Sequence, residues 1–143
     1  MTGYLLDTNV LSEYSRVAGP DRGIRSWVES TSRSVQYVSV ITLAEIEKGI
    51  ELLTPGRRRT ELGLWLRREL EVWFAGRTLV VDRPVASVLA ALMADGVRTG
   101  RPLLLVDSMI AATALVNGLT VVTRNTRDFA HTSVKVFNPW LQP

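Results

Sequence analysis

The chain has 143 residues, of which 46% are hydrophobic and 22% charged, which fits one folded domain over residues 1–143 and excludes a disordered or fibrous protein. It contains no cysteine, so disulfides, thiolate zinc sites and cysteine nucleophiles are excluded. The net charge is +3. Apart from Lys48 and Lys135, every positively charged side chain is an arginine, whose planar group suits phosphate. The charge is compatible with a nucleic-acid partner without requiring one.

No export or membrane segment is expected. The first apolar run, residues 4–6, has no basic region before it and ends at Asp7. The apolar stretch 102–122 contains Asp107 and Asn117, and a carboxylate at the centre of a bilayer costs about 2.5 kcal/mol or more. We therefore expect a cytoplasmic protein without membrane contact, which also suits the lack of cysteine.

In chain order, short apolar segments alternate with segments that have helical spacing of their apolar residues. Strands are predicted at residues 4–6, 35–40, 79–81, 119–122 and 134–137. Helices are predicted at residues 8–16, 21–30, 43–53, 57–74, 84–93 and 107–117. This alternation predicts a mainly parallel sheet covered by helices on both faces, an α/β sandwich. In such sheets functional groups gather at the carboxyl ends of the strands.

Three acidic residues lie next to apolar strands or helices rather than on polar, solvent-facing helix surfaces. Asp7 follows the first strand, Glu45 lies one turn into the helix after the second, and Asp107 follows the apolar run 103–106 and opens a helix. Each also has a structural explanation, because both aspartates fit N-caps and Thr42 and Glu45 fit a capping box. Carboxylates gathered at one sheet edge repel one another unless a cation or proton lies among them. Oxygen ligands alone favour Mg²⁺ or Mn²⁺.

A fourth group follows the strand at residues 119–122. Asn125 offers a neutral oxygen and Asp128 a charged one, although Asp128 fits a turn or local cap equally well. His131 is the only histidine, so a metal-free ribonuclease with two catalytic histidines is excluded, and we expect His131 in a surface loop. No phosphate-binding loop of the G-x-x-x-x-G-K-[ST] type occurs.

Four segments, in this order along the chain, resemble the signatures of PIN-domain proteins of the VapC and FitB toxin type. They are residues 5–13, 39–46, 107–114 and 122–129, and the ending 136–140 is also similar. The resemblance covers residues 4–140. It implies a three-layer α/β/α sandwich with a short, mainly parallel central sheet. It also implies the toxin of a type II toxin–antitoxin system, an Mg²⁺- or Mn²⁺-dependent endoribonuclease.

The resemblance also implies a set of site residues. Asp7, Glu45 and Asp107 match the core acids of the family, which act in catalysis and hold the metal. Many relatives carry an aspartate where this chain has Asn125. That difference leaves the fourth catalytic and metal-binding position to Asp128 or to a site with three acids.

Further residues and partners follow from the same resemblance. Thr8 and Asn9 match the family pattern and would orient Asp7 or hold water. Apart from the resemblance, Arg124 and Arg127 stand beside the fourth segment and are candidates for contacting the RNA backbone, with solvated loop arginines as the alternative. Toxins of this type usually form homodimers and are inhibited by a cognate antitoxin that binds DNA, which allows higher toxin–antitoxin complexes.

Two alternative functions remain at this point. A haloacid-dehalogenase-like phosphatase would use Asp7 as its nucleophile, but it needs a second aspartate where Asn9 stands, and a buried lysine, for which only Lys48 and Lys135 are available. A non-catalytic PIN fold that binds RNA or protein is the other alternative, and it depends on Asn125 having weakened the site.

Overall fold

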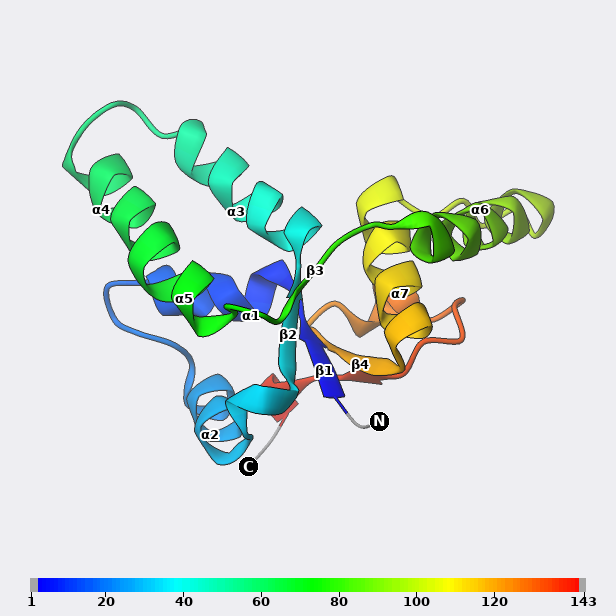
Figure 1. The fold of residues 1–143 in the computed structure, drawn as a ribbon, viewed down its shortest axis with the longest axis horizontal. Helices are drawn as coiled ribbons and strands as arrows, with labels where there is room; N and C mark the ends of the chain where they lie inside the picture. The colour runs from blue at the N-terminus through cyan, green and yellow to red at the C-terminus, as the bar shows by residue number, and fades with distance from the viewer. Residues whose placement is uncertain (1–2, 142–143) are drawn as a thin grey trace.

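The computed structural model describes residues 3–141 and contains a parallel five-stranded sheet in the order β3-β2-β1-β4-β5 (Figure 1). The strands are β1 (Gly3–Leu6), β2 (Gln36–Ser39), β3 (Thr78–Leu79), β4 (Leu119–Val122) and β5 (Val136–Phe137). The first strand lies in the centre, with Leu6 opposite Val122 of β4. The carboxyl ends of β1 and β4 are therefore neighbours, although the two strands are far apart in the sequence. Of the predicted domain 1–143, residues 1–2 and 142–143 lie outside the described residues.

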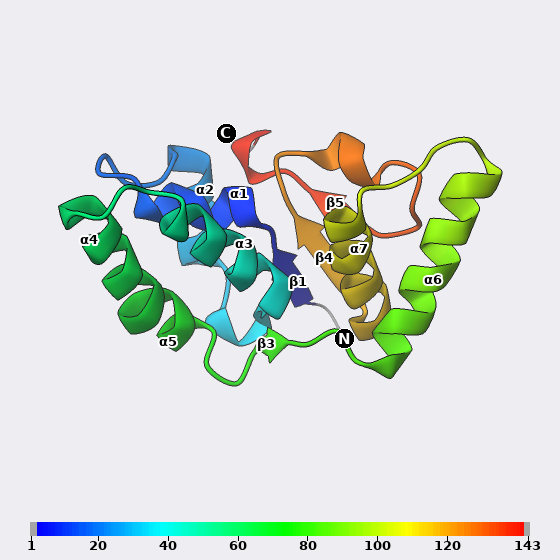
Figure 2. The ribbon, with the colours of Figure 1, turned by 90° about the horizontal axis from the view of Figure 1, so that it is seen from above.

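Helices cover both faces of the sheet, as predicted. Seen from above, α4 and α5 lie at one end of the molecule and α6 at the other, with α3 and α7 nearer the middle (Figure 2). The helices are α1 (Thr8–Ser12), α2 (Arg22–Ser30), α3 (Val40–Glu51), α4 (Arg57–Trp65), α5 (Glu71–Trp73), α6 (Arg83–Arg98) and α7 (Leu105–Asn117). Over residues 3–141, none of them is both long and apolar enough to cross a membrane.

Two hydrophobic cores, one on each face, hold the layers together. Leu6 packs into a core with side chains of α1 to α5, whereas its neighbour Leu5 packs into a second core with Ile110 of α7. Successive strand residues point to opposite faces, so both faces of this short sheet need apolar side chains. This explains why the strands read as continuous apolar runs and confirms the α/β/α sandwich.

Several boundaries differ from the sequence-based expectations. The strand predicted at 35–40 ends at Ser39, because the Ser39 hydroxyl caps α3 and Val40 already belongs to that helix. The helix predicted at 57–74 is continuous but contains a π-helical turn, Leu66–Leu70. The helical spacing of the apolar residues in 57–74 predicts a core side that includes Leu66 and Leu70, and both are buried.

The α6 helix is more exposed than predicted. The helical spacing of the apolar residues in 84–93 predicts a core side that includes Val85 and Met93; Val85 is buried, but Met93 is exposed. This expectation was wrong because α6 packs mainly against α7, so a single narrow side of it is covered. After α7, Gly118 adopts a φ of 64°, a left-handed conformation that glycine accepts without strain, and the chain turns directly into β4.

Candidate active site

Asp7 lies at the carboxyl end of the central strand, and only 8% of it is exposed. Its backbone N–H donates to the carbonyl of Val122 at 3.0 Å, which extends the pairing of β1 with β4. Its Oδ1 accepts from the backbone N–H of Thr8 at 2.9 Å, so the expected N-cap exists. Its Oδ2 accepts from the hydroxyl of Thr123 at 3.0 Å and, more weakly, from Asn9 Nδ2 at 3.4 Å. Both carboxylate oxygens therefore have fixed positions.

Thr123 is a site residue that the sequence reasoning missed. It is fully buried, and its hydroxyl donates to Asp7 while accepting from Asn9 Nδ2 and from the backbone N–H of Asn125, each at 3.0 Å. Asn9 Oδ1 in turn accepts from the backbone N–H of Arg124 at 3.1 Å. The available signal was positional: Thr123 follows β4 as Asp7 follows β1.

Glu45 points to the same edge from α3, but not as a capping-box residue. The Ser39 hydroxyl accepts from the N–H of Ile41 and caps the helix, so Thr42 and Glu45 lie inside it. The expected capping box is therefore wrong, because the helix begins earlier than Thr42. Glu45 Oε1 instead accepts from the hydroxyl of Thr8 at 2.7 Å. Thr8 thus positions Glu45 with its side chain and Asp7 with its backbone.

Asp107 lies in the first turn of α7 and is half-buried. The helix begins at Leu105 and its N-cap is Leu104, so the expectation that Asp107 opens or caps the helix is wrong. The apolar run before Asp107 supplies the first helical residues. A carboxylate in the first turn interacts favourably with the positive end of the helix dipole. The helix therefore stabilises this charge without using it as a cap.

The acids at this edge of the sheet influence one another's pKa values. Burial raises the pKa of Asp7 above its ordinary value, against the lowering effect of hydrogen bonds from Thr8 and Thr123. The negative charges of Glu45 and Asp128 raise it further. A proton or a cation at this edge would relieve that repulsion.

Asp107 belongs to the same cluster. Burial raises its pKa to about 6, and the charges of three other acids contribute: Asp128, Asp7 and Glu45. The four acids singled out from the sequence therefore influence one another electrostatically at this edge of the sheet. Asp128 reaches the cluster from an exposed turn, Thr126–Phe129, and Asn125 is exposed beside it.

The donor set fits a hard divalent cation. All four groups are carboxylates, the ligands that Mg²⁺ and Mn²⁺ prefer, and their mutual repulsion is what a cation would offset. Over residues 3–141, however, no three acidic or histidine side chains are close enough together to form a ready-made set of metal ligands. The fit therefore rests on the chemistry of the donors and on their mutual repulsion, which raises the pKa values of Asp7 and Asp107.

The raised pKa of Asp107 gives a pH-dependent stability. In this fold its pKa is about 6, against an ordinary 3.8, so between these values the folded chain holds a proton that the unfolded chain has released. In EDTA, the free energy of unfolding should therefore fall as the pH rises from about 4 to about 6. Thermal unfolding across this range should show a smaller fall for Asp107→Asn. Equal falls in both proteins would contradict the assignment.

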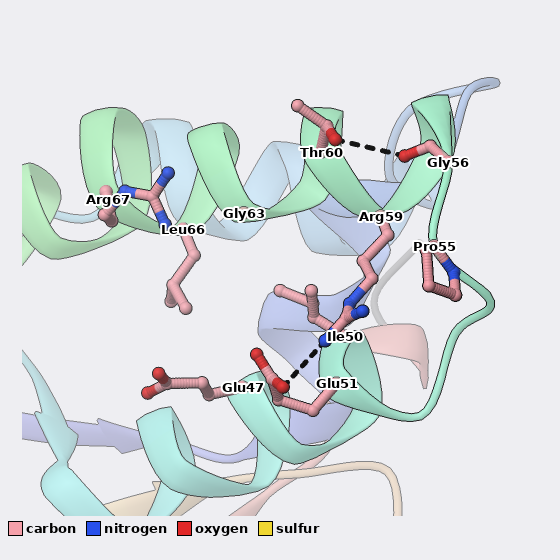
Figure 3. A pocket seen from close by; sticks show the side chains of 10 residues that line it. All are labelled: Glu47, Ile50, Glu51, Pro55, Gly56, Arg59, Thr60, Gly63, Leu66 and Arg67. Atoms are coloured by element: carbon pink, nitrogen blue, oxygen red, sulfur yellow. Dashed lines mark hydrogen bonds and ion pairs between the residues drawn. The ribbon is translucent and has the colours of Figure 1, made fainter.

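Two other polar features lie apart from the four acids. A hollow of about 350 Å³ between α3 and α4 is crossed by an ion pair of 2.8 Å between Arg59 and Glu51, above buried Ile50 and Leu66 (Figure 3). His131 is exposed in a turn and contacts Arg101 at 3.0 Å, which confirms a surface position. Neither feature contains a residue of the carboxylate cluster.

Comparisons with known proteins bear on this site. The family model of the PIN domain matches residues 4–135. The chain is 40% identical over 136 residues to Toxin FitB of Neisseria gonorrhoeae, covering 95% of this chain and 97% of that protein. It is 37% identical over 136 residues to VapC ribonuclease Y4jK of Sinorhizobium fredii, covering 95% and 96%.

Solved structures agree. The crystal structure of FitAcB from Neisseria gonorrhoeae contains a chain with a TM-score of 0.90 and 39% identity, covering 97% of this chain and 99% of that one. DNA-bound VapBC from Salmonella typhimurium contains one with a TM-score of 0.81 and 26% identity, covering 97% and 99%. These matches favour the nuclease interpretation over the phosphatase alternative.

Proposed function

This chain belongs to the PIN-domain family, and we propose that it is the toxin of a type II toxin–antitoxin system, an endoribonuclease that uses Mg²⁺ or Mn²⁺. The observation that carries the proposal is the buried Asp7, whose pKa is raised among other acids at the carboxyl edge of the sheet. A structural N-cap would not require that environment. We propose that it acts on RNA in the cytoplasm.

The residues divide into metal-holding and positioning groups. Asp7 and Asp107 would hold the ion directly, and Glu45 and Asp128 would complete the site or hold its waters. When bound, a divalent cation supplies Lewis-acid chemistry, which polarises the scissile phosphate and makes water a better nucleophile near neutral pH. Thr123 fixes Asp7 by the hydrogen bond described above. Attack of water on the phosphorus would break the bond to the 3′ oxygen, which takes up a proton, and would leave 5′-phosphate and 3′-hydroxyl ends.

The direct test is RNA cleavage by purified chain freed of any antitoxin. Total RNA is incubated with Mg²⁺, with Mn²⁺ and with EDTA, and the ends of the products are mapped. Cleavage that requires the cation and leaves 5′-phosphates supports the proposal, and the mapped sites identify the target RNA. RNA binding without turnover, unchanged by EDTA, would instead support the non-catalytic scaffold.

The fourth position of the site can be assigned by two variants. Asp128→Asn is expected to lower the single-turnover cleavage rate by about 10- to 100-fold, the effect typical of groups that support a metal site. Asn125→Ala should change it little, because the Asn125 group that contacts Thr123 is its backbone N–H. Melting temperatures serve as the control for folding. The reverse ranking of the two variants would assign the position to Asn125.

We propose that a cognate antitoxin inhibits the chain and links it to DNA. The support is that the similar solved structures include FitAB bound to a DNA fragment and DNA-bound VapBC. The chain covers 97% or more of those toxin-like chains, so it contains the equivalent of their whole fold. A higher complex of toxin, antitoxin and DNA would follow.

We also propose that the free chain forms a homodimer through an apolar surface beside the acids. Leu104 is 74% and Leu105 52% exposed at the start of α7, and Leu52 is 76% exposed directly after α3. An apolar hollow is lined by Leu52, by Met109 and by Val106, the neighbour of Leu105, and Glu45 also borders it. A patch of this kind on a globular protein indicates an interaction surface.

A charge in this surface should separate the dimer. Leu105→Glu is expected to convert the dimer to a monomer in sedimentation equilibrium, because a buried unpaired carboxylate is costly. Glutamate is favourable in the first turn of a helix, so the variant should fold. The matched control is Val72→Glu, at a 65% exposed valine of α5. Equal masses for Leu105→Glu and the unmodified chain would contradict this interface.

A further inference from the structure

One arginine beside the acid cluster is held on an aromatic ring. The guanidinium carbon of Arg124 lies 5.3 Å from the centre of the Trp140 ring. Arg124 is exposed, whereas Trp140 is half-buried and packs against the core. An arginine over an indole is held by cation–π attraction, which leaves the N–H groups at the edge of its plane free for a ligand.

The backbone of Arg124 is tied to the proposed catalytic residues. Its N–H donates to Asn9 Oδ1 at 3.1 Å, and Asn9 Nδ2 donates to Thr123 at 3.0 Å. Thr123 in turn donates to Asp7. A short chain of hydrogen bonds therefore fixes the start of the Arg124 side chain relative to the carboxylates.

The turn that carries Trp140 is itself held in place by a hydrogen bond and by packing on α2. Its backbone N–H donates to Asn138 Oδ1 at 2.9 Å, within the short helical turn Pro139–Leu141. This turn packs closely on α2, because a Cβ at Gly23 would lie only 2.5 Å from the Pro139 carbonyl oxygen. The absence of a side chain at Gly23 permits this contact, so the ring has a rigid base.

The charge of Arg124 is not used within the described chain. The ion pairs found across residues 3–141 involve Arg16, Arg57, Arg59 and Arg98, and Arg124 is not among them. Its side chain is also absent from the side-chain hydrogen bonds of that range, where only its backbone takes part. A positioned, planar cation with free N–H groups matches the pair of oxygens on a backbone phosphate, the anionic group of RNA.

We propose that Arg124, held in place by Trp140, binds a phosphodiester group of the RNA strand next to the scissile bond. This inference rests on the proposed function and adds a substrate-positioning residue to it. The acids cannot hold the RNA backbone by themselves, because carboxylates and phosphates repel each other. A fixed cation at the rim of the cluster would guide the strand past them.

Binding to a short fluorescein-labelled single-stranded RNA tests this, with Asp7→Asn in every protein so that the RNA stays intact. Adding Arg124→Gln is expected to weaken binding about tenfold, the loss of one charge-assisted contact. It should also reduce the slope of log K against log salt concentration by about 0.7, the value for one phosphate contact on a single strand. The matched control, Arg98→Gln, removes the same charge from α6. Equal affinities and slopes in the two variants would overturn the proposal.

Two further variants test the role of the ring. Arg124→Lys keeps the charge but not the planar stack, so the salt slope should remain while the affinity falls. Trp140→Leu should weaken binding about as much as Arg124→Lys, with little added effect when the two are combined. Unchanged affinity in folded Trp140→Leu would overturn the stacking part of the proposal.

Cleavage assays separate this inference from the proposed function. With Asp7 intact, Arg124→Gln should raise KM for RNA about tenfold and leave kcat nearly unchanged, as expected for a contact equally strong in the ground and transition states. If the intact chain cleaves RNA and Arg124→Gln leaves KM unchanged, this inference alone is wrong. If the intact chain never cleaves RNA but binding still depends on Arg124, the nuclease proposal alone is wrong.

Discussion

Asp7→Asn is expected to lower RNA cleavage by more than about 100-fold, because groups that merely support metal ligands already contribute about 10- to 100-fold. Asp7 is the most buried of the four acids and the one whose two oxygens are both fixed. Asparagine has nearly the same shape but lacks the negative charge that would hold a cation. The measurement is the single-turnover cleavage rate with saturating Mg²⁺.

The same variant should remain folded. Since burial and neighbouring acids raise the pKa of Asp7, the charged carboxylate opposes folding at neutral pH, and its removal should leave the melting temperature in EDTA unchanged or higher. The matched control is Asp95→Asn, which removes an exposed carboxylate from α6. A fully active Asp7→Asn would contradict the proposed site, and an inactive Asp95→Asn would show that cleavage is lost without any change at that site.

The sequence was sufficient for the architecture because the strands are buried on both faces. Each strand is only two to four residues long, yet it stands out as an apolar run between helical segments. Strand order could not be read in this way. It depends on pairing between segments far apart in the chain, such as Leu6 with Val122, for which a single sequence gives no signal.

The first residues of helices were predicted less well, because serine, threonine and acidic side chains can each cap a helix at more than one nearby position. Thr42 and Glu45 have the spacing of a capping box, but Ser39 lies one residue before α3 and caps it first. Asp107 resembles an N-cap, but Leu105 and Val106 before it are already helical. Neither Glu45 nor Asp107 therefore caps its helix, and both side chains are available to the acid cluster.

The acids could be predicted as a group because parallel strands bring their carboxyl ends to one edge. The hydrogen bonds that support these acids could not be predicted from the sequence. The bond between Thr8 and Glu45 joins residues 37 positions apart, and that between Thr123 and Asp7 joins residues 116 apart. Threonine occurs throughout the chain, so only the fold distinguishes these two.

Thr123→Val is expected to lower cleavage by about 10- to 100-fold while retaining the size and branched shape of the side chain. The Thr123 hydroxyl joins Asp7, Asn9 and the backbone of Asn125, so its removal frees the Asp7 carboxylate to turn and leaves two donors without their partner. The free energy of unfolding should fall by about 1–3 kcal/mol, the usual cost of unpaired buried polar groups. Single-turnover rates and urea unfolding measure the two effects.

Thr123→Ser and Thr120→Val complete the test. Serine keeps the hydroxyl and should restore most of the activity, which a general loss of packing would not predict. Thr120 lies in β4 itself, and within residues 3–141 its hydroxyl takes part in none of the hydrogen bonds of the site, so Thr120→Val should affect neither rate nor stability strongly. If Thr123→Val cleaves RNA as fast as the unmodified chain, the orientation of Asp7 does not depend on this hydroxyl, and the metal would have to orient the carboxylate by itself.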